Sequence, residues 1–380
     1  MTRRPRRAVR EVPAKTDPRI PGAPRGRRTV DVGGLERALR AEVEGEVRFD
    51  AGSRALYTQD ASNFRQVPIG LVVPRTLDDV VVAHRLCHRF GAPLLDRGGG
   101  TSLSGETVNE AVVVDHSKYL TDIGRVDAER RLVTCRPGVV NEELNRRTGE
   151  HGLVFGPDPS THSRCVIGGN IGNNSCGAHS VQSQLYGPGP RTSDSVRALE
   201  VVTYDGERFW TGVGEEKDLD RIIADGGAKG RIYAALRALR DRYTAAIRTG
   251  FPPVDRLPRR VSGYNLDELL PERGFNVARA LVGTEGTCAT VLQAVLELTP
   301  AMARRRLVVV AYDELAEAAD RCAEIVDRWR PIALEALDGR LVGNMRRLRM
   351  KEADVRLLPR LEDGDGWLMV EFGADTADEA

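Results

Sequence analysis

The chain has 380 residues, of which 41% are hydrophobic and 29% are charged, a composition typical of a soluble globular protein with two or three domains. Its formal net charge of +1 argues against nucleic acid as the main partner. No apolar run approaches the roughly 20 residues that a membrane-spanning helix needs.

A basic segment, residues 1–29, opens the chain. Its first 28 residues hold ten Arg or Lys residues against two acids, Glu11 and Asp17, which gives a net charge of about +8. This proline-rich segment without hydrophobic periodicity predicts a disordered tail. An arm that binds anionic lipid or a partner is the alternative. A twin-arginine export signal is disfavoured, because no apolar stretch follows the arginines.

A β-α-β unit is predicted after the helix-forming residues that follow the tail. Residues 69–73 form a short apolar run, which indicates a buried strand. Thr76 and Asp79 have the spacing of a capping box, so a helix begins there, and Gly91 ends it. Residues 93–95 start a second strand. The sequence RGGGTSLSG follows that strand directly.

Further strands and helices are predicted downstream. Residues 111–115 predict a third strand, and alternation over 126–137 predicts an antiparallel strand. An amphipathic helix is expected at 139–151. A strand and a turn follow at 196–206, where an Asp-Gly pair is the hairpin signal. Residues 280–299 contain a Gly-punctuated loop that enters another strand.

The pattern changes after Pro300. A strand is followed by a helix over 315–328 and by another strand over 367–372. We therefore predict a first domain over residues 30–300 and a second over 301–380.

The six cysteines are scattered without a CxxC pair. Structural zinc and iron–sulfur clusters need clustered thiolates, so we expect no metal within this chain. A disulfide scaffold is disfavoured in a chain of this length, and reduced cytoplasmic thiols are expected.

RGGGTSLSG, residues 97–105, is the first sequence with a predicted chemistry. Consecutive glycines at the end of a strand allow backbone N–H groups to converge on an anion, and Thr101, Ser102 and Ser104 add hydroxyl donors. A diphosphate is the ligand that this loop predicts. It is neither a Walker A loop nor a G-x-G-x-x-G fingerprint. A plain Gly-rich turn is the alternative for the loop taken alone.

A second Gly-rich segment runs through FGPDPSTHSRCVIGGNIGNNSCGAHS, residues 155–180. Glycine costs backbone entropy on folding, so such a run favours a place where the backbone must approach a ligand closely. A floppy loop is the alternative. Together the two segments predict a long ligand with a phosphate middle and a flat, polar-edged head.

Eight motifs resemble, in order, the FAD-binding domain of vanillyl-alcohol-oxidase and p-cresol-methylhydroxylase flavoproteins, and most specifically that of D-lactate and D-2-hydroxyglutarate dehydrogenases. They are VVPRTLDDV, RGGGTSLSG, GPDPS, IGGNIGNNSCG, LYG, LEVVTYDG, SGYNLDELL and LVGTEGT. The resemblance covers about residues 65–300. It implies an α+β fold in which a two-subdomain FAD-binding domain, residues 30–300, precedes the start of an α+β cap domain, residues 301–380.

The resemblance also implies where FAD binds. The diphosphate would lie on residues 98–102, the isoalloxazine and ribityl chain against 157–160 and 168–177, and the adenine near Val201 and Val202. Thr101 stands where covalent relatives have His, so we expect non-covalent FAD. The implied cofactor-binding residues are Gly98, Gly99, Gly100, Thr101, Ser102, Pro157, Asp158, Ser160, Gly168, Gly169, Gly172, Asn173, Asn174, Gly177, Val202 and Glu285.

Substrate and catalytic residues are implied less specifically. Arg259, Arg260 and Ser262 occupy the neighbourhood where relatives hold the substrate carboxylate, which suits an Arg fork, and surface arginines are the alternative. His179 and His162 are candidates for the catalytic base, with ordinary structural roles as the alternative. The His-rich catalytic motif of the relatives does not occur here. We therefore expect a fragment of a longer enzyme or one half of a split enzyme.

The expected function is FAD-dependent oxidation of a D-2-hydroxy acid, of the D-lactate or D-2-hydroxyglutarate type, to the 2-oxo acid. Electrons would pass to a quinone, a cytochrome or an iron–sulfur protein, with any iron–sulfur cluster in a downstream region or a partner. The alternatives are a flavin-carrying electron-transfer subunit, as in the glycolate oxidase type, and a flavin reductase of the cell-wall-precursor type. We expect a cytoplasmic location, with attachment to the inner membrane face left open.

Overall fold

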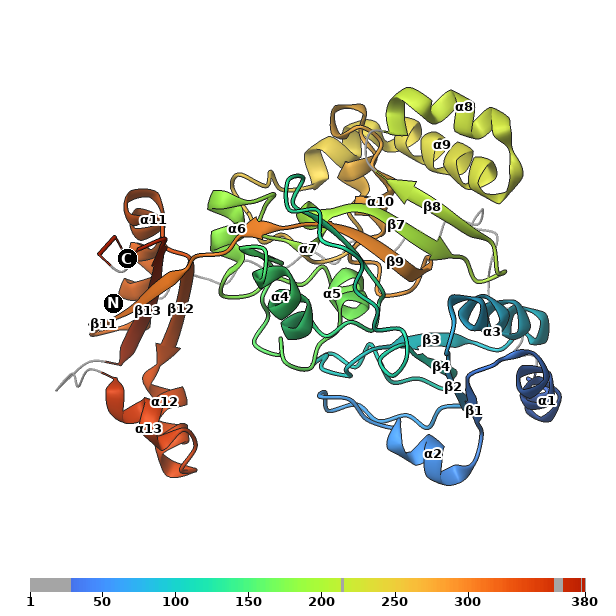
Figure 1. Ribbon diagram of the computed structural model, residues 1–380, viewed down its shortest axis with the longest axis horizontal. Helices are drawn as coiled ribbons and strands as arrows, with labels where there is room; N and C mark the ends of the chain where they lie inside the picture. The colour runs from blue at the N-terminus through green and yellow to red at the C-terminus, as the bar shows by residue number, and fades with distance from the viewer. Residues whose placement is uncertain (1–28, 213–214, 359–364, 377, 380) are drawn as a thin grey trace, which may run out of the picture.

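The computed structural model describes residues 29–212, 215–358, 365–376 and 378–379. The tail predicted over residues 1–29 lies outside these ranges except for Thr29. Three main sheets, each with helices packed on it, make up the molecule (Figure 1). This arrangement confirms the predicted α+β fold. Within the described part of the chain, no helix is both long and apolar enough to cross a membrane.

The N-terminal sheet has the strand order β1-β2-β4-β3. Strand β2 is parallel to β4 and β4 to β3, while β1 is antiparallel to β2, so the predicted β-α-β unit is present. The elements of this part are β1 (Glu46–Arg48), β2 (Gly70–Val73), β3 (Leu94–Arg97), β4 (Val112–Asp115), α1 (Val32–Glu42), α2 (Ala51–Leu56) and α3 (Leu77–Phe90).

Local sequence signals explain the bounds of α3. The side chain of Thr76 accepts a hydrogen bond from the backbone N–H of Asp79, and Asp79 caps the backbone of Thr76 in return, which completes the predicted capping box. Gly91 ends the helix in the left-handed region at φ 66°. Ala83 and Leu86 lie on the apolar face of α3, fully buried in the core beneath the sheet.

The second sheet is antiparallel, with the order β5-β9-β7-β8. Strand β5 is shorter than the predicted 126–137, because residues 127 and 132 bridge across a turn in which Arg131 has φ 57°. Its elements are β5 (Leu132–Cys135), β7 (Val196–Val202), β8 (Arg208–Gly212) and β9 (Thr290–Glu297), with the two-stranded pair β6 (Leu153–Val154) and β10 (Thr299–Pro300) beside them.

Several helices surround this sheet. The helix predicted over 139–151 is α4 (Asn141–Gly149), and the long helix α9 (Gly227–Gly250) was not predicted. The others are α5 (Ile167–Asn173), α6 (Ser180–Tyr186), α7 (Thr192–Ser195), α8 (Leu219–Asp225) and α10 (Val277–Leu281), with 3-10 turns η1 (Glu215–Asp218), η2 (Leu266–Leu269) and η3 (Pro271–Arg273).

Part of the second Gly-rich segment is helical as α5, although a loop was expected there. The helix has no side-chain cap, and glycine disfavours helices. Tertiary hydrogen bonds hold it instead: Gly168 N–H donates to Pro137 O at 2.8 Å, and Gly283 N–H donates to Ile171 O at 2.9 Å. A Cβ on Gly168 would lie 2.8 Å from the Pro137 side chain, so only glycine permits this approach.

The C-terminal sheet has the order β11-β13-β12 and is antiparallel throughout. It lies at one end of the molecule, next to α6 (Figure 1), where Tyr186 donates a hydrogen bond to Arg330 O at 3.1 Å. The predicted change of pattern at residue 301 falls between β10 and β11. The elements are β11 (Arg304–Tyr312), β12 (Ala333–Asp338), β13 (Gly366–Ala374), α11 (Leu315–Trp329), α12 (Gly339–Arg347) and α13 (Glu352–Leu357).

Candidate functional site

An elongated groove lies where the parallel strands β3 and β4 end, which is where open α/β sheets generally bind ligands. It consists of two adjoining cavities of about 780 and 570 Å³, both partly open to solvent. They form one groove because the same five residues line both. These are Gly98, Thr107, Val166, Gly169 and Asn173.

The loop after β3 forms one wall of the groove. Gly98 to Ser102 all line it. The loop packs tightly on the chain behind it, since a Cβ on Gly99 would lie 2.2 Å from Arg164 O. Arg97 fixes the loop at its start by donating hydrogen bonds to Thr107 O at 3.0 Å and to Gln59 O at 2.8 Å. A diphosphate here would therefore be met by backbone N–H groups and hydroxyls.

One face of α5 forms the opposite wall. Gly169, Gly172 and Asn173 line the groove, and their i, i+3, i+4 spacing places them on one side of the helix. A Cβ added at Gly169 or Gly172 would meet no protein atom closer than 3.9 Å. The missing side chains therefore leave space that a ligand can fill. This cradle, together with the Gly98–Ser102 loop, fits a long ligand with a diphosphate, such as FAD.

The end of the groove near β9 combines acceptors with apolar walls. Asp96, His116, Glu106 and Glu285 line it, beside Val201, Leu281 and Val291. Burial, and then the nearby Glu106, raise the pKa of Glu285 above its ordinary value. Sequence reasoning missed Asp96, Glu106 and His116. The available signal for Asp96 and His116 was their position at or just beyond the ends of predicted parallel strands.

Some of the sequence-predicted cofactor residues do not line the groove. Pro159 and Thr161 do so rather than their predicted neighbours in the 157–160 segment. Val201 faces the groove and Val202 packs in a separate core, because successive strand residues point to opposite faces. The predicted residues that line it are Gly98, Gly99, Gly100, Thr101, Ser102, Gly168, Gly169, Gly172, Asn173 and Glu285, and those that do not are Pro157, Asp158, Ser160, Asn174, Gly177 and Val202.

Asn174 and Gly177 have structural contacts instead. Asn174 is fully buried at the end of α5 with φ 49°, and its Oδ1 accepts a hydrogen bond from Ser193 N–H at 2.9 Å. A Cβ on Gly177 would lie 1.8 Å from Asp158 O. Both residues therefore shape the segment that follows α5.

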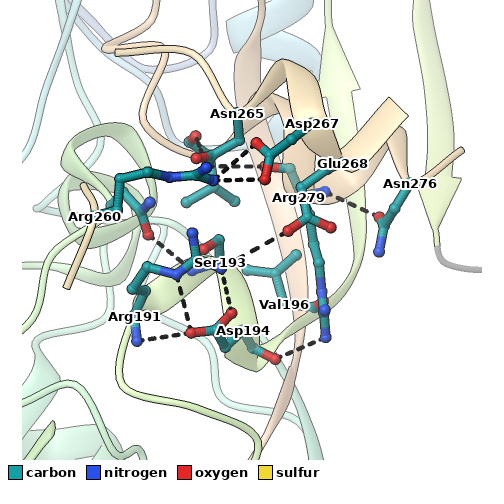
Figure 2. A network of polar contacts seen from close by, with 12 residues as sticks. Arg191, Ser193, Asp194, Val196, Arg260, Asn265, Asp267, Glu268, Asn276 and Arg279 are labelled. Carbon is teal, nitrogen blue, oxygen red and sulfur yellow. Dashed lines mark hydrogen bonds and ion pairs between the residues drawn. The ribbon is translucent and has the colours of Figure 1, made fainter. Parts of the chain in front are cut away.

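A buried ionic network lies behind Asn174 (Figure 2). Arg191, which is 2% exposed, binds Asp194 through two guanidinium nitrogens at 2.7 and 3.1 Å. Its Nη2 also lies 3.7 Å from a carboxylate oxygen of Glu268. Because Ser193 sits between these charges in the chain and binds Asn174, the network anchors the end of α5.

The predicted substrate residues do not reach the groove. Arg260 belongs to the buried network, where its Nη2 donates to both carboxylate oxygens of Asp267 at 2.7 and 2.8 Å (Figure 2). Arg259 donates to Gly177 O at 2.7 Å, and Ser262 is exposed. None of these three residues lines the groove.

The two histidines proposed as the base are also elsewhere. His179 lies between Asp158 and Glu371, each 2.7 Å from a ring nitrogen. Hydrogen bonds to Asp158 and then Glu371 raise the pKa of His179 to about 9, so the ring is protonated at neutral pH and cannot accept a substrate proton. His162 is half-exposed, with its Nδ1 3.9 Å from Glu142. Its side chain does not line the groove.

Comparison with known proteins places the groove in a family of domains. Residues 68–212 match the family described as FAD binding domain. This match includes β3, β4, α5, the Gly98–Ser102 loop and most of the groove lining.

Full-length relatives extend well beyond this chain. D-2-hydroxyglutarate dehydrogenase from Pseudomonas putida is 30% identical over 81% of this chain and 30% of its own length. D-lactate dehydrogenase from Archaeoglobus fulgidus is 27% identical over 84% of this chain and 60% of its own length. Glycolate oxidase subunit GlcD from Bacillus subtilis is 28% identical over 78% of this chain and 52% of its own length.

Solved structures agree on the fold. An alkyldihydroxyacetonephosphate synthase superposes with a TM-score of 0.59 at 16% identity, covering 90% of this chain and 56% of that chain. The chain therefore contains an FAD-binding domain of the vanillyl-alcohol-oxidase and p-cresol-methylhydroxylase type, similar to that of FAD-linked D-lactate and D-2-hydroxyglutarate dehydrogenases.

Proposed function

We propose that this chain binds FAD in the groove and is the flavin-binding part of an enzyme that oxidises a D-2-hydroxy acid to the 2-oxo acid. The observation that carries the proposal is the glycine face of α5, where Gly169 and Gly172 leave room for a ligand opposite the Gly98–Ser102 loop. The similarity to named 2-hydroxyacid dehydrogenases supports the substrate class.

The residues of this chain bind and orient the cofactor in this proposal. Backbone N–H groups of the Gly98–Ser102 loop and the hydroxyls of Thr101 and Ser102 bind the diphosphate. Pro159, Thr161 and Ser175 line the far end of the groove, where the flavin ring is held. FAD, when bound, supplies the redox chemistry.

The substrate base is not assigned to His179 or His162, given their contacts. Among the described residues that line the groove, His116 is the one imidazole, and it is committed to Asp96. A general base contributes about 10²–10⁴-fold to such reactions. We therefore expect slow oxidation of hydroxy acids by this chain alone.

A flavin-carrying subunit of a multi-component oxidase is the second candidate. The similarity to a glycolate oxidase subunit favours it. In that case electrons leave through a partner, and we infer a quinone, a cytochrome or an iron–sulfur protein as the acceptor. We also propose that residues 301–380 belong to a substrate-covering domain and that the protein acts in the cytoplasm, where its six free cysteines stay reduced.

Anaerobic mixing of the purified flavoprotein with D-2-hydroxyglutarate or D-lactate tests the proposal. Loss of the visible flavin absorbance with either D-acid, and not with the L-acids, supports the dehydrogenase. Reduction by dithionite alone, with no response to any 2-hydroxy acid even when full-length relatives respond, contradicts it and favours the subunit function. Reduction driven by NADPH contradicts both and favours a flavin reductase.

A further inference from the structure

Asp96, His116 and Thr290 form a hydrogen-bonded cluster in the groove, and no role is assigned to it above. Asp96 lies in the last turn of residues of β3, His116 directly follows β4, and Thr290 is the first residue of β9. The Nε2 of His116 lies 2.8 Å from Asp96 Oδ1, and Thr290 Oγ1 donates to Asp96 Oδ2. All three residues line the groove.

The imidazole of His116 has one nitrogen without a partner. The residue is 4% exposed, and its Nδ1 has no hydrogen-bond partner. Beside it, the buried ring of His84 also has two nitrogens without side-chain partners in the described structure. Leaving such an atom buried and unpaired costs about 1–3 kcal/mol. A ligand that pairs with Nδ1 would remove this penalty.

The protonation pattern determines what that ligand must offer. Burial by itself would raise the pKa of Asp96, but hydrogen bonds from His116 and Thr290 and the nearby imidazoles bring it below its ordinary value. The carboxylate is therefore ionised at neutral pH and only accepts hydrogen bonds. The Nε2 of His116 must then carry the proton and Nδ1 the lone pair. The cluster presents acceptors, so its ligand must be a donor.

The position of the cluster in the groove identifies the donor. The diphosphate of FAD has acceptors only, and the Gly98–Ser102 loop meets it near the middle of the groove. The cluster lies at the end with the apolar walls Val201, Leu281 and Val291, which suit the faces of a flat base. The adenosine half of FAD carries donors on its ribose hydroxyls and its adenine amino group.

We propose that Asp96 and His116 bind the adenosine half of FAD by accepting hydrogen bonds from its ribose hydroxyl or adenine amino groups, and that they thereby select the dinucleotide over FMN. This inference rests on the proposed function, since it requires FAD in the groove. It adds the orientation of the cofactor and the residues that read the adenosine.

Binding of nucleotide fragments to the apoprotein tests the parent chain directly. We expect ADP to bind in calorimetry, because it carries the diphosphate and the adenosine without a flavin. 2′-Deoxy-ADP binding about tenfold more weakly than ADP identifies the ribose hydroxyl as the donor, and IDP binding about tenfold more weakly identifies the amino group. If all three bind equally while FAD binds tightly, the inference is overturned and the proposed function stands.

Two variants test the residues themselves. Asp96→Asn keeps the shape of the side chain but places an N–H donor on Nε2, so His116 Nδ1 becomes a donor and repels the ligand donor. His116→Phe removes the acceptor. We expect both to weaken ADP and FAD about tenfold and to leave FMN binding unchanged, whereas His88→Phe, an exposed histidine on α3, changes none of them.

The outcomes separate the two proposals. Unchanged ADP affinity in a folded Asp96→Asn protein overturns the inference, and circular dichroism melting establishes whether each variant is folded. If His116→Phe does not fold, the fragment comparison on the parent chain still decides. A parent protein that binds neither FAD nor ADP contradicts the proposed function and the inference together.

Discussion

The Nε2 of His179 lies 2.7 Å from Glu371 Oε2, which joins the segment after α5 to strand β13 across 192 positions of the chain. The other ring nitrogen, Nδ1, lies 2.7 Å from Asp158. Arg305 of β11 also approaches, with its Nη1 3.3 Å from Nε2. The protonated imidazole thus holds the 157–160 segment against the C-terminal sheet.

This cluster predicts a pH-dependent contribution to stability. The pKa of His179 is raised from 6.5 to about 9, so its contribution is complete below about pH 6.5 and is lost as the pH rises through 9. Its hydrogen bond with His179 lowers the pKa of Glu371, so that contribution is lost as the pH falls below the ordinary value of 4.5. The free energy of unfolding of His179→Gln should fall short of the parent value by about 1–3 kcal/mol near pH 6.

Urea unfolding at several pH values measures this difference. It should shrink toward zero between pH 7 and 10, and the half-exposed His162→Gln should show no comparable deficit. A deficit that stays constant from pH 6 to pH 10 would show that the ring does not act through its charge.

Gly169 provides the sharpest separation of binding from stability. Its substitution by Leu should place a side chain in the groove without meeting protein atoms, since a Cβ there has no neighbour within 3.9 Å. We expect FAD affinity to fall at least about tenfold, while helix stability rises by up to about 1 kcal/mol because glycine is replaced. Flavin fluorescence titration and thermal melting of the apoprotein measure the two effects. Gly149→Leu, at the exposed end of α4, is the matched control, and equal FAD binding by Gly169→Leu would contradict the location of the site.

Gly99→Val should behave differently from Gly169→Leu. The added Cβ would lie 2.2 Å from Arg164 O, so the loop must move away from the segment behind it. We expect both FAD affinity and the melting temperature of the apoprotein to decrease. The reason differs from the one that the sequence suggests, in which the side chain fills the phosphate space. Loss of FAD without any loss of stability would favour that earlier reason.

The network behind Asn174 predicts a large loss of stability. Asp194→Asn leaves the guanidinium of Arg191 buried with its main partner neutralised, which costs about 3–5 kcal/mol for such pairs. Asp220→Asn also removes an ion pair, with Arg237, but its side chain is 97% exposed and the cost should stay below about 1 kcal/mol. Chemical denaturation of the two variants measures the contrast. Equal stabilities would mean that the buried pair is dispensable.

Local signals explain which parts of the fold could be predicted. The capping box of Thr76 and Asp79 and the apolar face of α3 act within a few residues, so both were predicted correctly. Strand β1 was missed because it has only three residues, and its pairing with β2 is a contact between distant segments. Helix α5 was missed because its glycines oppose a helix, and tertiary hydrogen bonds to Pro137 and the 283–285 turn stabilise it.

The same distinction applies to the site. Loop glycines are recognisable in sequence because their backbone role restricts the residue type, and Gly98–Gly100 line the groove as expected. Asp96 and Thr290 are 194 positions apart, and nothing local to either indicates that they share a hydrogen bond. His179 was taken as a base because its charged partners, Asp158 and Glu371, come from other segments.

The most direct test of the account is the identity of the flavin in the purified protein. Acid or heat precipitation followed by chromatography of the supernatant should release FAD at about one equivalent per chain, because Thr101 offers no imidazole for covalent attachment. Flavin that stays with the precipitate would contradict non-covalent binding. A protein that contains no flavin and takes up neither FAD nor ADP after reconstitution would contradict the central claim that this groove is an FAD site.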